Sequence, residues 1–169
     1  DAHRYSFSDL KRAPSEDRIR LLSLEIPVFK VDLNVEWMEN SLEANTIVTC
    51  NSEHFNDYLQ LYVAVIESSV TAYTGVDGDT TFRNVVLDML PTPAGRLLGN
   101  DWICGEKDTL VTSWTYADYV EDKEDLALVA FVQDRHDGRI LQATVDYFDE
   151  NTGTDVPDRF ERATLNVYP

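Results

Sequence analysis

Two stretches of the chain alternate between hydrophobic and polar residues with a period of two. The first spans residues 29–37, and its hydrophobic face consists of Phe29, Val31, Leu33, Val35 and Trp37. The second lies within residues 58–67, and its hydrophobic face consists of Leu59, Leu61, Val63 and Val65. Successive side chains of a β-strand point to opposite faces, so the pattern predicts two strands that each bury one face. Such a chain folds by covering the hydrophobic faces of its sheets.

The remaining segments also favour strands. Runs rich in β-branched and aromatic residues predict further strands at 20–26, 44–50, 109–119, 126–134, 139–148 and 159–168. Two of these runs are joined by Arg135-His136-Asp137-Gly138, which predicts a hairpin with Asp-Gly at its turn. Because no strand–helix–strand rhythm is present, we expect an all-β, antiparallel, immunoglobulin-like β-sandwich of about seven strands.

One segment has a different period. Phe82, Val85, Val86 and Met89 are spaced at i, i+3, i+4 and i+7. This spacing predicts one short helix near residues 81–90, ended by the prolines that follow it. We expect the following hydrophobic side chains to meet in the core: Leu61, Val63, Val65, Phe82, Val86 and Met89.

The length of 169 residues fits one domain with an extension. Residues 1–19 are polar apart from Tyr5, Phe7 and Leu10, so we expect them to form an N-terminal arm or linker. Residues 20–169 are expected to form the β-sandwich domain. No run of about 18 hydrophobic residues is present, so we expect no membrane insertion.

The charge balance is strongly acidic. Asp and Glu number 31 against 14 for Lys and Arg, which gives a formal net charge of −17. Such a surface repels nucleic acid, so nucleic acid is excluded as a partner. It is typical of a soluble extracellular protein, or of one adapted to salty water, where charges are screened.

The chain has two cysteines, Cys50 and Cys104, without the spacing of a zinc site. In an oxidising compartment they are expected to form a disulfide. His3, His54 and His136 fall in an arm, a loop and a turn, without an H-E-x-x-H motif, and no G-x-S-x-G motif is present. We therefore expect no catalytic residues, no enzyme activity and no organic cofactor.

Two acidic loops are compatible with the binding of calcium. Three oxygen-bearing residues surround Gly153, namely Asp149, Asn151 and Asp155, and a second loop carries Asp77 and Asp79. Calcium takes several oxygen ligands from a flexible loop, although neither loop has the complete twelve-residue pattern. Calcium at residues 149–155 and plain solvated acidic loops therefore both remain as interpretations.

Aromatic residues raise the question of a sugar-stacking surface, because they include Trp37, Trp102, Trp114, Tyr116 and Tyr119. Trp37 and Trp114 are in phase with hydrophobic neighbours, which favours packing in the core. Trp102 lies in an expected loop beside Gly105, so it is the candidate ligand residue.

Two motifs resemble a known family. The run LYVAVIES, an acidic loop and FRNVVLDMLPTPAG together resemble the C-terminal β-sandwich of the outer-membrane-protein-28-related family of Bacteroidota. The later run AFVQDRHDGRILQA is similar to a strand pair of the same family, whereas Arg83 and Asp88 depart from its pattern. The ending Leu165-Asn166-Val167-Tyr168-Pro169 resembles the start of a type nine secretion sorting domain.

The resemblance implies a non-catalytic module of a secreted or cell-surface bacterial protein, acting in adhesion, spacing or extracellular assembly as in a fibre or array. Its partners would be other extracellular proteins or copies of itself. A thioredoxin-like domain precedes the sandwich in some members, but no C-x-x-C is present here, so redox activity is not implied. The alternatives are a carbohydrate-binding module, with glycans as ligands, and an accessory domain of a secreted enzyme.

Overall fold

The computed structural model describes residues 27–148 and is nearly all β-strand in this range. Ten strands are present in residues 27–148, and seven of them have eight or more residues. They form antiparallel sheets, so the predicted all-β antiparallel sandwich is confirmed. The predicted strands at 20–26 and 159–168, and the predicted boundary at residue 19, lie outside the described residues.

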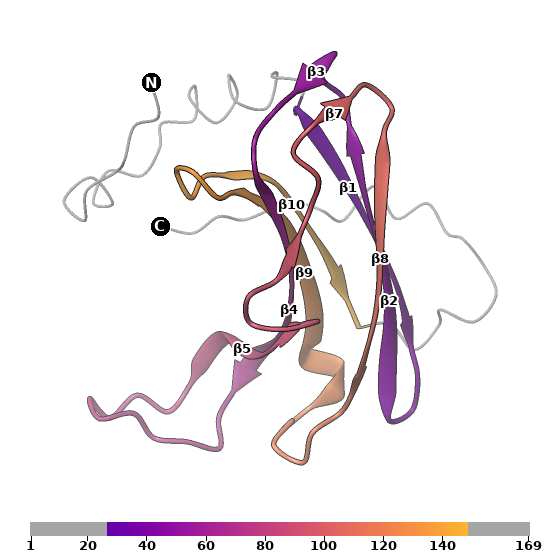
Figure 1. The fold of residues 1–169 in the computed structure, drawn as a ribbon. Coiled ribbons are helices and arrows are strands. Elements are labelled where there is room, and N and C mark those ends of the chain that lie inside the picture. Colours follow the sequence, from indigo (N-terminus) through magenta and orange to yellow (C-terminus); the bar gives the residue numbers. More distant parts are fainter. Residues whose placement is uncertain (1–26, 149–169) are drawn as a thin grey trace, which may run out of the picture. The chain divides into compact units, whose positions relative to one another are not determined.

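One layer of the sandwich is a three-stranded sheet in the order β1-β2-β8 (Figure 1). Its strands are β1 (Phe29–Trp37), β2 (Ser41–Cys50) and β8 (Lys107–Thr115). On β1 the buried positions are Phe29, Val31, Val35 and Trp37, as the alternation predicts, while Leu33 is half-buried. The hydrophobic face of this sheet therefore forms one wall of the core.

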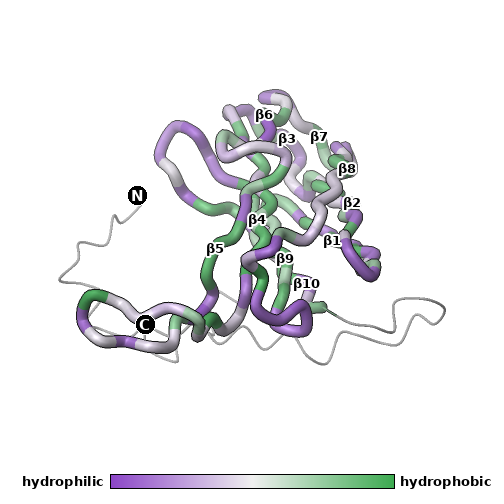
Figure 2. The backbone as a smooth tube through the Cα atoms, turned by 90° about the horizontal axis from the view of Figure 1, so that it is seen from below, coloured by the Kyte–Doolittle hydropathy of each residue, from purple (hydrophilic) through white to green (hydrophobic). Residues whose placement is uncertain are grey.

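The other layer is a five-stranded sheet. Four of its strands lie in the order β10-β9-β4-β5, and β6 pairs with the first residues of β4, next to the part that pairs with β5. Its strands are β4 (Leu59–Val70), β5 (Phe82–Leu90), β6 (Arg96–Leu97), β9 (Leu126–Asp134) and β10 (Ile140–Tyr147). The short strands β3 (His54–Phe55) and β7 (Trp102–Ile103) pair separately at one end. The hydrophobic colour in Figure 2 follows β4 and β5, whereas several connecting loops are hydrophilic.

The core contains the inward residues of both sheets. Leu61, Val63 and Val65 of β4 are at most 1% exposed and belong to this core, as predicted. Their neighbours on β9 are also buried, because β4 and β9 pair in register from Leu59 opposite Asp134 to Glu67 opposite Leu126. Every second residue of the two strands thus faces the three-stranded sheet.

The predicted helix near residues 81–90 is wrong, because this segment is the edge strand β5. It pairs with β4 from Val70 opposite Phe82 to Val63 opposite Leu90. The register shifts by one residue between Val65 and Ile66 of β4, which is a β-bulge on β5. The bulge breaks the period of two, and it produces a spacing of hydrophobic residues that imitates a helix.

Because of the bulge, part of the predicted core is wrong. Val86 is 56% exposed, and Phe82 and Met89 are only half-buried. Within residues 27–148 the one helical element is a three-residue 3₁₀ turn, η2 (Lys123–Asp125). The hairpin of β9 and β10 turns at residues 135–138 as predicted, with Gly138 at φ 76°. Among these described residues no helix is long and hydrophobic enough to cross a membrane.

Polar side chains connect the two sheets along one open side. The indole nitrogen of Trp114 on β8 donates a 3.0 Å hydrogen bond to a carboxylate oxygen of Asp88 on β5. The guanidinium of Arg96 on β6 contacts Asp108 on β8 at 2.6 Å and donates to the carbonyl of Thr109 at 2.7 Å. These contacts hold β5 and β6 beside β8.

Replacing Val63 by Asp should prevent folding. Val63 is fully buried on β4, and an unpaired buried charge costs several kcal/mol, which is comparable to the whole stability of about 5–15 kcal/mol. Circular dichroism and the soluble yield measure the outcome. Val111→Asp is the matched control, because Val111 on β8 is 59% exposed and should tolerate the charge. A soluble Val63→Asp protein that unfolds cooperatively would contradict the assignment of this face.

Candidate functional site

The two cysteines lie close together at one end of the sandwich. The Gly105 amide donates a 2.9 Å hydrogen bond to the Cys50 carbonyl, which places Cys104 next to the end of β2. The thiol of Cys50 is 3.5 Å from the carbonyl oxygen of Ser52, and that of Cys104 is 3.8 Å from the carbonyl oxygen of Asn51. Both cysteines are free thiols in the structure. The disulfide between them stays a prediction.

The candidate ligand residue Trp102 does not lie in the expected loop. It is part of strand β7 and only 3% exposed. Its ring packs edge-on against Phe29, with centroids 5.4 Å apart, and its indole N–H donates to the carbonyl of Gly99 at 2.7 Å. A buried ring has no free face for a sugar, so this assignment needs correction. The core positions predicted for Trp37 and Trp114 are confirmed.

The predicted calcium ligands Asp149, Asn151 and Asp155 lie outside the described residues. In the part of the chain that the structure describes, no group of three or more His, Cys, Asp or Glu side chains could hold a metal ion. That part includes the loop with Asp77 and Asp79. Calcium binding at residues 149–155 therefore stays a prediction.

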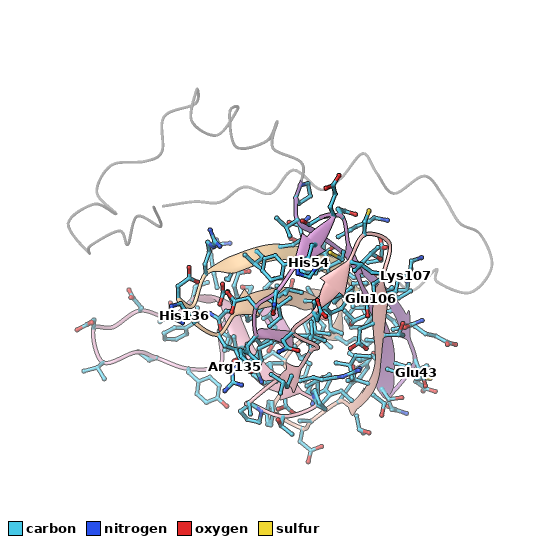
Figure 3. The ribbon with its side chains drawn as sticks, turned by 45° about the horizontal axis from the view of Figure 1, so that its top comes forward. Glu43, His54, Glu106, Lys107, Arg135 and His136 are labelled. Atoms are coloured by element: carbon cyan, nitrogen blue, oxygen red, sulfur yellow. The ribbon has the colours of Figure 1, made fainter. Side chains whose placement is uncertain are left out.

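The two described histidines lie in different parts of the molecule, as Figure 3 shows. His54, on β3, has its Nδ1 3.6 Å from a carboxylate oxygen of Asp101. His136 lies in the turn between β9 and β10, where its amide donates to the side chain of Asp134 at 2.7 Å. Both residues are exposed. His136 is in a turn as predicted, whereas the loop predicted for His54 is wrong, because this residue pairs with Ile103 of β7.

A buried carboxylate lies at the end of the sandwich opposite β3 and β7. Glu67 is fully buried and follows Leu61, Val63 and Val65 on the inward face of β4. Its Oε1 accepts hydrogen bonds from the backbone amides of Glu121 and Asp122 at 2.9 and 2.8 Å. Its Oε2 is buried and has no hydrogen-bond partner among the described residues. A buried polar atom without a partner is uncommon in folded proteins and calls for an explanation.

A second carboxylate continues the connection toward the loop between β4 and β5. The carboxylate of Glu121 accepts from the Thr71 amide at 2.8 and 3.0 Å and from the Ala72 amide at 2.6 Å. These backbone hydrogen bonds stabilise the charged form and lower the pKa of Glu121 below its ordinary value. The side chain of Asp122 accepts from the Glu124 amide at 2.9 Å and caps η2. Acidic side chains thus hold the two loops together through backbone amides.

A cavity of about 240 Å³ lies where these loops meet the end of the five-stranded sheet. Glu67 lines it, and it is the one charged residue of the lining. The other lining residues are hydrophobic or aromatic: Val70, Tyr73, Phe82, Val85, Leu87 and Tyr119. Tyr73 and Tyr119 are 60% and 51% exposed, so aromatic surface is accessible there. The accessible lining is thus hydrophobic and aromatic, while the Glu67 oxygen that lacks a partner is itself buried.

Sequence reasoning did not identify Glu67, although a signal for it exists. The alternation of Leu61, Val63 and Val65 continues for one more step to Glu67. A strand residue in phase with three core residues is expected to point inward. A carboxylate at such a position requires hydrogen-bond donors when buried, so it could have been singled out as structural or functional.

Comparison with known proteins shows the fold but no family. No family model matches the chain, and no curated protein matches it. The structure resembles HBP35 of Porphyromonas gingivalis with a TM-score of 0.63 and 16% identity, over 83% of this chain and 48% of that chain. It also resembles a domain of the outer membrane lipoprotein Omp28 from Porphyromonas gingivalis, with a TM-score of 0.53 and 9% identity, over 74% of this chain and 91% of that chain.

At these identities the likeness shows a shared fold and nothing further. The match spans about half of the length of the HBP35 chain. The expected similarity to the β-sandwich of an Omp28-related protein is therefore confirmed for the fold. The sorting sequence predicted at Leu165–Pro169 lies outside the described residues, so it stays a prediction.

Replacing Glu121 by Gln should reduce the loss of stability that occurs as the pH is lowered. The folded pKa of Glu121 is lowered, so its contribution to stability is present above its unfolded pKa of about 4.3 and is lost as the pH falls through the folded value. Melting temperatures measured between about pH 3 and pH 7 should show wild type above the variant at neutral pH and a shrinking difference below about pH 4. Glu43→Gln, an exposed change on β2, controls for net charge. A difference that is independent of pH would contradict this role.

Proposed function

We propose that the chain is a non-catalytic β-sandwich module of a secreted or cell-surface bacterial protein. The observation that supports this most is the sandwich shared with the Omp28 domain, 91% of which is covered by the match. That domain belongs to an outer membrane lipoprotein, and HBP35 comes from the same bacterium. The formal net charge of −17 agrees with a role at a solvated surface, because it opposes non-specific association with anionic polymers and lipids.

Within this function the module acts in adhesion, spacing or assembly of extracellular proteins. Among residues 27–148, the outer strands of the five-stranded sheet are β5 and β10, and hydrophobic side chains are exposed on both. Val86 of β5 is 56% exposed, and Ile140 and Tyr147 of β10 are 54% and 60% exposed. Edge strands with unpaired backbone groups accept strands of other chains, so they support contacts with partner proteins or with a second copy. Oligomers in light scattering would identify self-assembly, whereas a monomer would leave a spacer role.

A carbohydrate-binding module, or an accessory domain of a secreted enzyme, is the second candidate. The exposed rings of Tyr73 and Tyr119 beside the cavity support it, because aromatic surfaces stack on sugars. The burial of Trp102 argues against the ligand site that the sequence suggested. A glycan array separates this candidate from the first, since a spacer or assembly module binds no glycan.

The surface location is tested on intact cells of the source bacterium. Proteinase K added to intact cells should remove the signal of an antibody raised against residues 27–148 and leave a cytoplasmic marker protein intact. The chain is expected to be degraded because a module outside the outer membrane is accessible to the protease. A chain that remains intact until the cells are lysed would contradict the proposed function.

A further inference from the structure

The five-stranded sheet is hydrophobic on its outer face as well as on the face that covers the core. Residues directly opposite each other in paired strands point to the same side, so the pairing of β5, β4, β9 and β10 defines rows across the outer face. None of the residues in three neighbouring rows is charged, although 27% of the chain is charged. These rows consist of Tyr62, Phe131 and Ala143; of Met89, Ala64, Val129 and Val145; and of Val86, Ile66, Ala127 and Tyr147.

The outer face of the three-stranded sheet has the composition of a solvated surface. An antiparallel sheet that packs one face on a core usually carries polar residues on the other. Charged residues lie in the outer rows of all three strands, namely Lys30, Asp32 and Glu36 on β1, Glu43 on β2 and Lys107 on β8. Figure 3 labels Glu43 and Lys107. The hydrophobic outer face of the five-stranded sheet therefore departs from the pattern that the same molecule shows on its other side.

Strand β10 shows this departure most clearly. Its outward residues Ala143, Val145 and Tyr147 are hydrophobic or aromatic, whereas the residues that point toward the core side are polar: Gln142, Thr144 and Asp146. Ala143 and Tyr147 are exposed, Tyr147 by 60%, and Val145 is half-buried. A continuous hydrophobic surface of this kind typically marks a contact with another macromolecule.

We propose that this outer face binds the same face of a second copy of the chain in a two-fold symmetric dimer. A two-fold contact pairs a surface with itself, so the surface has to be self-complementary. On β10, Val145 lies midway between the small Ala143 and the projecting ring of Tyr147. A two-fold axis at Val145 sets the ring of each copy over Ala143 of the other. Because the face is uncharged, two acidic chains meet there without burying a charge.

The size of the face predicts a weak dimer that is strengthened by salt. Four strands about 4.8 Å apart and about eight residues long, at about 3.3 Å per residue, give a face of roughly 500 Å². Two such faces bury roughly 1,000 Å² together, the lower limit for a specific interface, so we expect a Kd of roughly 10–100 µM. Each chain carries a formal net charge of −17, and salt screens the repulsion between the copies.

Sedimentation equilibrium of the 169-residue chain tests the dimer. Between about 1 µM and about 1 mM protein, the average mass should rise from that of the monomer toward twice this mass. The Kd should fall at least about fivefold when NaCl is raised from about 0.05 M to about 0.5 M, because screening weakens the repulsion between the chains. A contact held by ion pairs would dissociate under the same change.

Two variants locate the contact. Val145→Glu brings two carboxylates together across the axis, so the Kd should rise at least about tenfold. Tyr147→Ala removes the exposed ring without adding a charge and should also raise the Kd. Val111→Glu is the matched control, because it adds the same charge at a 59% exposed valine on the outer face of the other sheet and should leave the Kd unchanged. Thermal unfolding followed by circular dichroism, at concentrations where the wild-type chain is monomeric, verifies that each variant is folded.

A chain that stays monomeric over the whole range of protein and salt would overturn the proposal and leave the face to a different protein or to another part of the polypeptide. A dimer that persists unchanged in both Val145→Glu and Tyr147→Ala would also overturn it and would place the contact elsewhere, as at the strand edges.

The proposal rests on the proposed function, since it names a second copy as the partner in assembly. The two fail separately. A monomeric chain that is degraded by protease on intact cells would contradict the dimer alone. A dimeric chain that is protected on intact cells would contradict the surface location alone.

Discussion

The antiparallel pairing of β4 with β9 and β5 is the constraint on which the rest of the structure depends. β4 is the longest strand described, and it contributes Leu59, Leu61, Val63 and Val65 to the core. The same alternation carries Glu67 inward at the next position. Because a shift of one residue would exchange the two faces of the strand, the hydrophobic residues fix the place of the carboxylate as firmly as their own.

From that position Glu67 organises one end of the sandwich. It binds the backbone amides that precede η2, and Glu121 from the same loop binds the amides at the start of the β4–β5 loop. Figure 1 shows both loops at the end of the molecule opposite β3 and β7. A buried carboxylate requires hydrogen-bond donors, so Glu67 favours a loop arrangement that hydrophobic packing alone would not specify. The cavity lies where these loops meet the end of the five-stranded sheet.

Regular alternation allowed most of the fold to be predicted, and irregular geometry limited the rest. Residues 29–37 alternate without interruption, and the strand formed as expected. The helix predicted at residues 81–90 is wrong because a bulge and the positive φ of Asn84 disturb the period of an edge strand. The bulge is visible only from the pairing with the neighbouring strand. The loop predicted for Trp102 is wrong because β7 pairs with β3, a segment far from it in the sequence. The candidate site could not be predicted as a whole, since its loops are joined by hydrogen bonds to Glu67 and Glu121 between residues far apart in the sequence.

Hydrogen exchange of the Glu121 and Asp122 amides tests most directly whether Glu67 organises this end. Both amides lie outside the strands, so without the carboxylate they should exchange as fast as those of an open loop. Slow exchange in the wild-type chain is expected, together with exchange at least about tenfold faster in Glu67→Ala while the amides of β4 stay protected. Fast exchange of both amides in the wild-type chain would contradict the central role of Glu67.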